Sequence, residues 1–441
     1  MNIKIKFAAL ATAAWALSSF GDASISQVAV RQQWPWSTKI NVDFTLANET
    51  GGAVDVTVAA TNGNAEVVLP DAALSGNRIG LSSSGNYRIV IDPAKLNLGA
   101  ATVLGDFKVS LSVAPSRADY GDVLYRIYAL DGSTPARTDV TVADLLNGKY
   151  GAYETDYTYA NGGAWNPANV LIWTGVTNNP AYKTTHLVMR KVPHGSFTMC
   201  EYQCAPGTNV TLTADYFIGV FEMTQAQYGY ICPGHTIDFA PLGDVYPAEN
   251  VKWGGDLRGA NSELDSRQWP TVKGVTSDSL MGKLRTLTDD NSFDLPTEAQ
   301  WEYACRAGST THWNNGEDNQ TSGAANPVLP KLGRTKYTGG DDYGIAMVGS
   351  YFPNAWGIYD MHGNVSEYCL DVWYDKNSLV IDSTNPGAGV SANDEERKTR
   401  VCKGGSYSHS PSNQYVDQRS GQKAGTAAQL IGFRVICEVG E

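Results

Sequence analysis

Apolar and polar residues alternate with a period of two in the first part of the chain. The clearest stretch has apolar side chains at every second position: Ile40, Val42, Phe44 and Leu46. Residues 48–52 (NETGG) interrupt the pattern, which then resumes over residues 54–58. Successive side chains of a strand point to opposite faces, so this pattern predicts two β-strands joined by a turn.

The same alternation returns in three later segments, residues 87–91, 107–113 and 124–128. Several short strands separated by turn residues predict a small antiparallel β-sandwich, immunoglobulin-like, over residues 24–130. This segment contains no histidine and no cysteine, so we interpret it as an adhesive or spacer domain. Residues 131–185 are rich in Gly, Asn, Thr and Tyr with little periodicity, which indicates a structured connector.

Two short helices are predicted further along by capping boxes, in which a Thr and a Gln three residues later satisfy free N–H groups of the first turn. The pairs are Thr224 with Gln227 and Thr297 with Gln300. Both helices lie in sequence that otherwise predicts strands and long loops. The Gly-rich strand-to-helix turns of nucleotide-binding folds are missing. Residues 186–441 are therefore predicted to form an α+β domain.

The first 23 residues have the order of a secretory signal. Lys4 and Lys6 precede an apolar run over residues 7–17, and small residues follow at 21–23. A membrane anchor is the alternative, but the run is shorter than the roughly 20 residues that a spanning helix needs. We therefore expect an exported protein, periplasmic or extracellular, without a membrane span in the mature chain.

Composition limits the partners of this 441-residue chain. Its 42% apolar and 18% charged residues allow a folded core. The 33 Lys and Arg against 45 Asp and Glu leave a formal net charge of -12, which provides no basic surface for nucleic acid.

The chain has seven cysteines, all in its C-terminal part: Cys200, Cys204, Cys232, Cys305, Cys369, Cys402 and Cys437. Export permits disulfides, and an odd number leaves at least one cysteine unpaired. Cys200 and Cys204 have no second Cys or His pair at zinc spacing, so a zinc site is not expected there.

A series of motifs in the C-terminal part resembles the formylglycine-generating enzyme, or sulfatase-modifying factor, family. In order they are 192–199 (VPHGSFTM), 222–228 (EMTQAQY), 247–253 (PAENVKW), 295–304 (LPTEAQWEYA), 348–367 (ending DMHGNVSE), 403–407 (KGGSY) and 432–434 (GFR). The resemblance covers about residues 190–441. It implies a C-type-lectin-like α+β fold and says nothing about residues 24–180.

The resemblance implies that family members that form formylglycine hold two cysteines, spaced C-x-x-x-x-C, shortly after the Gly-Gly-Ser segment. These two cysteines bind copper(I). Soft thiolate ligands suit copper(I). The matching positions of this chain hold His409 and Gln414, and no cysteine lies between Cys402 and Cys437. Catalytic residues are therefore not assigned, and copper is not expected.

Two other metals follow from the resemblance. Relatives of the ergothioneine-synthesis type are non-haem iron oxygenases with His ligands. The six histidines here show no His-x-x-x-His spacing: His186, His194, His235, His312, His362 and His409.

The resemblance also implies a calcium site in the segment of this chain over residues 360–367. Asp360 and Glu367 would supply carboxylates there, and Gly363 and Val365 would supply backbone carbonyls, which suits a hard cation in a structural role. A buried turn with satisfied polar groups is the alternative. A second calcium site would map to Asn326 with Asp341 or Asp342.

Three functions remain open from the sequence. The first is a non-catalytic binding module, a pseudoenzyme whose lectin-like groove holds a peptide, protein or glycan. Its contacts would come from polar and aromatic residues after the Gly-Gly-Ser segment: Ser408, His409, Asn413, Gln414 and Tyr415. The second is a formylglycine-generating oxidase that activates exported sulfatases. The third is a non-haem iron oxygenase of the same family.

Overall fold

The computed structural model describes residues 23–32, 36–49, 51–96, 98, 104–155, 157, 167, 170–200, 207–234, 243–259, 275–318, 327–338, 344–373 and 399–440. The predicted signal, apart from Ala23, lies outside these residues, as do His235, Asn326, Asp341 and Asp342. The chain divides into two compact units. Unit 1 comprises Met1–Val123, Val140–Thr155 and Trp173–Val176, and unit 2 comprises Leu124–Asp139, Asp156–Ile172 and Thr177–Glu441.

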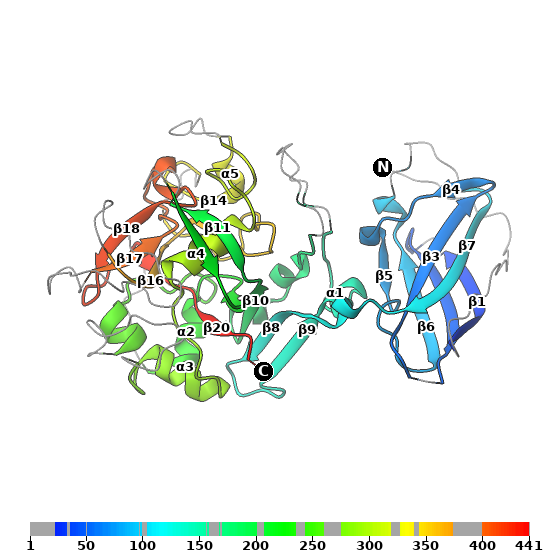
Figure 1. Ribbon diagram of the computed structural model, residues 1–441, viewed down its shortest axis with the longest axis horizontal. Coiled ribbons are helices and arrows are strands. Elements are labelled where there is room, and N and C mark those ends of the chain that lie inside the picture. The colour runs from blue at the N-terminus through cyan, green and yellow to red at the C-terminus, as the bar shows by residue number, and fades with distance from the viewer. Residues whose placement is uncertain are drawn as a thin grey trace. The chain divides into compact units, whose positions relative to one another are not determined.

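Unit 1 contains two antiparallel sheets (Figure 1). The first has the order β1-β2-β6-β5, from strands β1 (Ser24–Gln32), β2 (Ile40–Ala47), β6 (Gly85–Ile91) and β5 (Leu74–Gly76). The second has the order β4-β3-β7, from β4 (Ala65–Val67), β3 (Val54–Asn62) and β7 (Phe107–Pro115). The strands predicted over residues 40–46, 54–58, 87–91 and 107–113 are confirmed.

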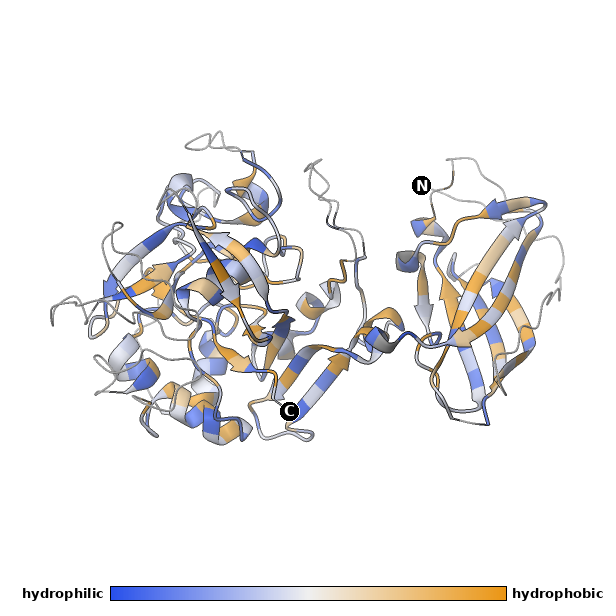
Figure 2. Cartoon of the chain, in the orientation of Figure 1, coloured by the Kyte–Doolittle hydropathy of each residue, from blue (hydrophilic) through white to orange (hydrophobic). Residues whose placement is uncertain are grey.

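The alternating side chains of both sheets meet in one hydrophobic core. Val42 and Phe44 of β2, Val56 of β3 and Leu111 of β7 all belong to it, and each is at most 4% exposed. Figure 2 shows apolar and polar residues alternating along these strands. A buried inner face and a polar outer face on each strand explain why the period of two was visible in the sequence.

The strand predicted at residues 124–128 forms, but its predicted place in the N-terminal sandwich is wrong. It is β8 (Val123–Ala129), which pairs with β10 (His186–Val192) in a sheet of order β20-β13-β10-β8-β9. The other members are β9 (Arg137–Thr141), β13 (Tyr216–Gly219) and β20 (Ile436–Glu438). Alternation identifies a strand but not its partner, so the sequence could not place β8.

The predicted connector over residues 131–185 contains regular structure and contributes to both units. Strand β9 belongs largely to unit 2, whereas helix α1 (Val142–Leu146) belongs to unit 1. Short 3-10 helices follow at η4 (Thr174–Asn178) and η5 (Pro180–Lys183).

The rest of unit 2 consists of short strands and short helices. The strands pair as β11 (Gly195–Met199) with β12 (Thr208–Leu212), as β14 (Gly333–Arg334) with β15 (His362–Gly363), and in a sheet of order β18-β17-β16-β19. The last sheet contains β16 (Ser366–Val372), β17 (Thr399–Lys403), β18 (Arg419–Lys423) and β19 (Ile431–Gly432). The helices are α2 (Gln225–Ile231), α3 (Leu280–Thr288), α4 (Glu298–Arg306) and α5 (Leu329–Leu332).

Both predicted capping boxes begin helices. At α2, Gln227 N–H donates to Thr224 Oγ1 at 3.2 Å, and Thr224 N–H donates to Gln227 Oε1 at 3.0 Å. Thr297 and Gln300 make the same reciprocal pair at α4. The prediction of a sheet-rich α+β fold for unit 2 is thus supported. None of the helices in the described part of the chain is both long and apolar enough to cross a membrane.

A buried ion pair joins α4 to β17. Lys403 Nζ lies 2.9 Å from Glu302 Oε2, and both side chains are inaccessible to solvent. Arg306 lies 2.9 Å from the other oxygen of Glu302, which also accepts a hydrogen bond from Cys200 N–H. Burial alone would raise the pKa of Glu302, but Lys403 and Arg306 hold it below its ordinary value. This pair fixes the end of β17, from which the 403–415 segment continues.

We predict that Glu302→Gln lowers the free energy of unfolding by about 3 kcal/mol. It removes the carboxylate that both Lys403 and Arg306 face and leaves Lys403 only the more distant Glu298, at 3.9 Å. Chemical denaturation at neutral pH measures this loss. Since the native pKa of Glu302 is depressed, its contribution is present above the ordinary carboxyl pKa of 4.5 and is lost as the pH falls below it. The difference between wild type and variant should shrink accordingly.

The exposed carboxylate variant Asp278→Asn serves as the control, and it should change stability little. An equal loss in both variants, or a Glu302→Gln difference that does not change below pH 4.5, would contradict the role given to this ion pair.

Candidate functional site

The segment after β17 folds back on itself because it begins with two glycines. Gly404 and Gly405 have φ of 82° and 69°, a backbone region that favours glycine. A Cβ at Gly405 would also lie 2.4 Å from the carbonyl oxygen of Asn413. This close approach brings Ser406 against the 3-10 helix η8 (Pro411–Gln414), which ends at Gln414, while His409 lies just before the helix.

His409 is turned toward Ser406. Its Nδ1 accepts a hydrogen bond from Ser406 N–H at 2.9 Å and lies 3.1 Å from Ser406 Oγ. A backbone amide can only donate, so neutral His409 carries its proton on Nε2. Burial lowers the pKa of His409, which favours this neutral form. The half-buried ring can offer its Nε2–H to a ligand.

Gln414 is fully buried rather than exposed to a groove. Its Nε2 donates to the Ser406 carbonyl at 2.8 Å, while its own backbone carbonyl accepts from His362 Nδ1 at 2.7 Å. Within the described part of the chain, its Oε1 has no hydrogen-bond partner. The side chain therefore closes the loop from inside.

Tyr415 also departs from its predicted role as a ligand contact. It is 8% exposed, and its ring packs edge-on against His312 and Trp313 with centroids 4.6 and 5.0 Å apart. By contrast, Ser408 is half-buried and Asn413 is exposed. The accessible members of the predicted binding set are thus Ser408, His409 and Asn413. The sequence of this loop has no hydrophobic periodicity, so no pattern in it predicts that Tyr415 points inward.

His362 is a structural residue. Its Nδ1–H donates to the Gln414 carbonyl, and its Nε2 accepts from Asn314 N–H at 3.3 Å. Burial lowers the pKa of His362 to about 4, so the ring is neutral at neutral pH. Both ring nitrogens are occupied, which leaves neither for a metal.

The predicted calcium segment is held by an ion pair. Glu367 receives two hydrogen bonds of 2.6 Å from Arg434 and a third of 2.7 Å from Trp301 Nε1. These three groups are buried, and the guanidinium already neutralises the carboxylate. Glu367 therefore does not fit as a calcium ligand in this arrangement, because a cation beside Arg434 would be repelled.

Asp360 is in a different environment from Glu367. One of its oxygens accepts from Gly349 N–H at 2.6 Å, and the other is buried with no hydrogen-bond partner among the described residues. Burial raises its pKa to about 6. Of the two predicted carboxylate ligands, Asp360 alone retains a free acceptor. The remaining predicted ligands, the carbonyls of Gly363 and Val365, lie on β15 and just before β16.

Glu222 is a site residue that the sequence analysis missed. Its carboxylate accepts from Asn364 Nδ2 at 2.6 Å and from Val365 N–H at 3.1 Å. Burial, followed by the nearby charges of Asp360 and Glu367, raises the pKa of Glu222 well above its ordinary value. Glu222 opens the 222–228 motif, and Arg434 ends the 432–434 motif, but their common location could not be read from motif order.

None of the described cysteines lies within the 403–415 segment, although Cys402 of β17 immediately precedes it. Cys200 is disulfide-bonded. The free cysteines in the described part of the chain are all buried: Cys232, Cys305, Cys369, Cys402 and Cys437. Burial raises the pKa of each thiol. These thiols are therefore protonated at neutral pH.

Among the described residues, no three His, Cys, Asp or Glu side chains form a group that could hold a metal ion. His194 pairs with Asp215 at 2.6 Å, and His312 pairs with Asp318 at 2.9 Å. His186 Nδ1 lies 2.8 Å from its neighbour Thr185. The described histidines thus have separate local partners.

Similarity to known proteins is concentrated in unit 2. The family described as "Sulfatase-modifying factor enzyme 1-like domain" matches residues 175–439. The formylglycine-generating enzyme of Mus musculus is 35% identical over 147 residues, which are 32% of this chain and 38% of that one. The Streptomyces coelicolor formylglycine-generating enzyme is 30% identical over 236 residues, covering 48% and 70% of the two chains.

Among solved structures, PvdO from Pseudomonas aeruginosa aligns with 57% of this chain and 94% of its own, at 22% identity and a TM-score of 0.43. The alignment with the mouse enzyme leaves more than half of that enzyme's length uncovered. The family match itself covers more than half of the present sequence. The chain therefore belongs to the family defined by the sulfatase-modifying factor enzyme 1-like domain.

Proposed function

We propose that this chain is an exported, non-catalytic member of its family. Its C-type-lectin-like unit would bind a peptide, protein or glycan through the accessible side of the 406–413 segment. The proposal rests on the hydrogen bonds that His409 and Gln414 form. Both side chains form hydrogen bonds with Ser406 inside the loop. The resemblance places the two copper-binding cysteines of the family oxidases at these two positions.

These two residues differ chemically from the pair that they replace. A copper(I) site of two thiolates depends on soft, negatively charged sulfur. A neutral imidazole whose Nδ1 accepts a backbone hydrogen bond and a buried amide supply neither property. The free cysteines of the described residues are buried in other elements, and their raised pKa values disfavour thiolates.

Two observations support export. The first 23 residues carry the basic, apolar and small-residue order of a signal. Cys200 takes part in a disulfide, which is typical of proteins outside the reducing cytoplasm.

A ligand at the 406–413 segment would meet Ser408, His409 and Asn413, which are half-buried or exposed. The His409 ring is fixed by its bond to Ser406, so its Nε2–H is a preorganised donor. The hydroxyl and amide of the other two side chains can donate and accept. Such a set suits hydrogen-bonded recognition of a polar ligand.

Formylglycine generation is the second candidate, favoured by the 30–35% identity to enzymes of that name. It would require activation of oxygen without the cysteine pair. A direct assay separates the two candidates. The purified protein is loaded with copper(I) and incubated with a Cys-x-Pro-x-Arg peptide, and mass spectrometry follows conversion of the cysteine to the aldehyde.

We expect no aldehyde from the wild type above a copper-only control. The matched variant His409→Cys/Gln414→Cys restores both thiols at the family spacing, and we expect it to bind copper(I). Circular dichroism checks that the variant is folded. Aldehyde formation by the wild type would refute the non-catalytic proposal.

The family resemblance implies calcium at residues 360–367, whereas the ion pair of Glu367 with Arg434 favours a segment that is held without the cation. Because Arg434 already neutralises Glu367, we expect a calcium chelator to leave the melting temperature unchanged. Emission spectroscopy of the dialysed protein measures bound calcium directly. Stoichiometric calcium together with a lower melting temperature in the chelator would show that the segment has a structural cation.

A further inference from the structure

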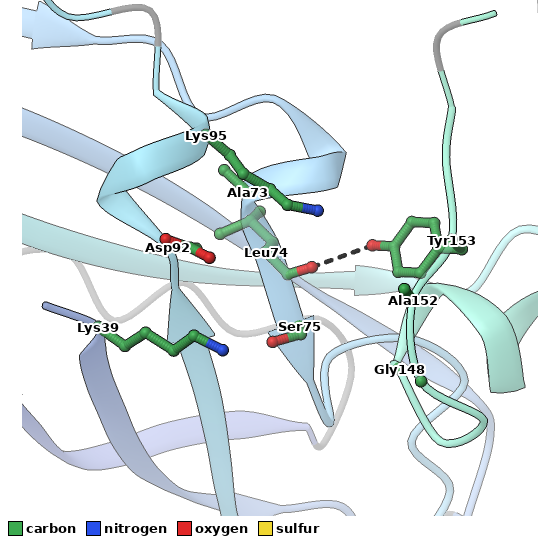
Figure 3. A pocket seen from close by; sticks show the side chains of 10 residues that line it. Lys39, Ala73, Leu74, Ser75, Asp92, Lys95, Gly148, Ala152 and Tyr153 are labelled. Carbon is green, nitrogen blue, oxygen red and sulfur yellow. Dashed lines mark hydrogen bonds between the residues drawn. The ribbon is translucent and has the colours of Figure 1, made fainter. Parts of the chain in front are cut away.

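Unit 1 contains a cavity of about 330 Å³ beside the edge strand β5. Its walls come from four places in the sequence: Lys39 before β2, strand β5 with Ala73 before it, the 3-10 helix η2 (Pro93–Lys95) with Asp92 before it, and residues 148–153. Figure 3 shows the side chains around it. Polar or charged groups reach this space from Lys39, Ser75, Asp92 and Lys95.

The wall formed by residues 148–153 is fixed to the sheet. The Tyr153 hydroxyl lies 3.0 Å from the carbonyl oxygens of Asp71 and Leu74, and its ring is 5% exposed. Gly76 N–H donates to the Asn147 carbonyl at 3.0 Å. This wall is therefore held at both of its ends against β5 and Asp71, which keeps one side of the cavity preformed.

The two lysines of the cavity differ from the other described lysines of unit 1. Lys108 pairs with Asp106 at 3.0 Å, and Lys149 pairs with Asp144 at 2.9 Å. In the described structure, the ammonium groups of Lys39 and Lys95 have no such carboxylate within ion-pair distance. They can serve a ligand without breaking an existing ion pair.

Asp92 lies between the two lysines in Figure 3. One of its oxygens accepts from Ala94 N–H at 3.0 Å and so caps η2. The other oxygen can accept from a ligand. Two cations against one carboxylate favour a ligand with one negative charge, while Asp92 and the Ser75 hydroxyl favour a ligand that also carries hydroxyl groups.

We infer that this cavity binds an acidic monosaccharide unit. Its volume lies near the lower end of small-molecule sites, about 300 Å³ upward, which suits one sugar ring rather than a folded peptide. The acidic group would lie at Lys39 and Lys95, and hydroxyl groups would donate to Asp92. This inference concerns unit 1 and does not depend on the function proposed for unit 2.

Titration calorimetry of the full chain with D-glucuronate tests the inference. We expect saturable binding that is at least tenfold weaker in Lys39→Ala/Lys95→Ala. Lys108→Ala removes a lysine of the same unit outside the cavity, and it should bind within twofold of wild type. Both lysines of the cavity are exposed, so the double variant should keep its melting temperature.

Three further ligands show which chemical groups the cavity recognises. Neutral D-glucose should bind at least tenfold more weakly than glucuronate, and equal binding would overturn the role of the charge. If glucose 6-sulfate binds more tightly than glucuronate, the inference of an acidic sugar holds, and the acidic group of that sugar is a sulfate. Inorganic sulfate binding as tightly as either sugar would overturn the inference, as would the absence of saturable binding by both acidic sugars.

Discussion

The architecture of unit 2 depends on charges buried together with their counter-charges. Its strands and helices are short, so few backbone ladders hold the loops in place. Arg434, just before the terminal strand β20, instead binds Glu367 of β16 and the carbonyls of Gly219 and Tyr359. Burial alone would lower the pKa of Arg434, but the surrounding carboxylates raise it. One guanidinium thereby ties four chain segments together, its own and those of Gly219, Tyr359 and Glu367.

The Glu302–Lys403 pair extends this principle to the candidate site. It anchors β17 to α4, and the two glycines that follow bring the chain back over itself. The scaffold thus sets where the loop begins, and the side chains at the two positions matched to the family cysteines close it. His409 and Gln414 can occupy those positions because Ser406 offers its N–H to one and its carbonyl to the other. These two hydrogen bonds close the loop.

Features that depend on local chemistry could be predicted from the sequence. Alternating residues located the strands of unit 1, and Thr-Gln pairs located the starts of α2 and α4. Features that depend on tertiary contacts could not be predicted. The partner of β8, the inward orientation of Tyr415 and the burial of Glu222 beside Asn364 all depend on segments distant in the sequence.

Copper(I) affinity shows directly whether two thiolates are present at the loop, because it does not depend on turnover. The wild type is titrated against a strong copper(I) chelator, and X-ray absorption identifies the ligands of any metal retained. We expect the chelator to keep the copper and no two-sulfur coordination to appear. Stoichiometric transfer of copper(I) to the protein with two sulfur ligands would contradict this expectation.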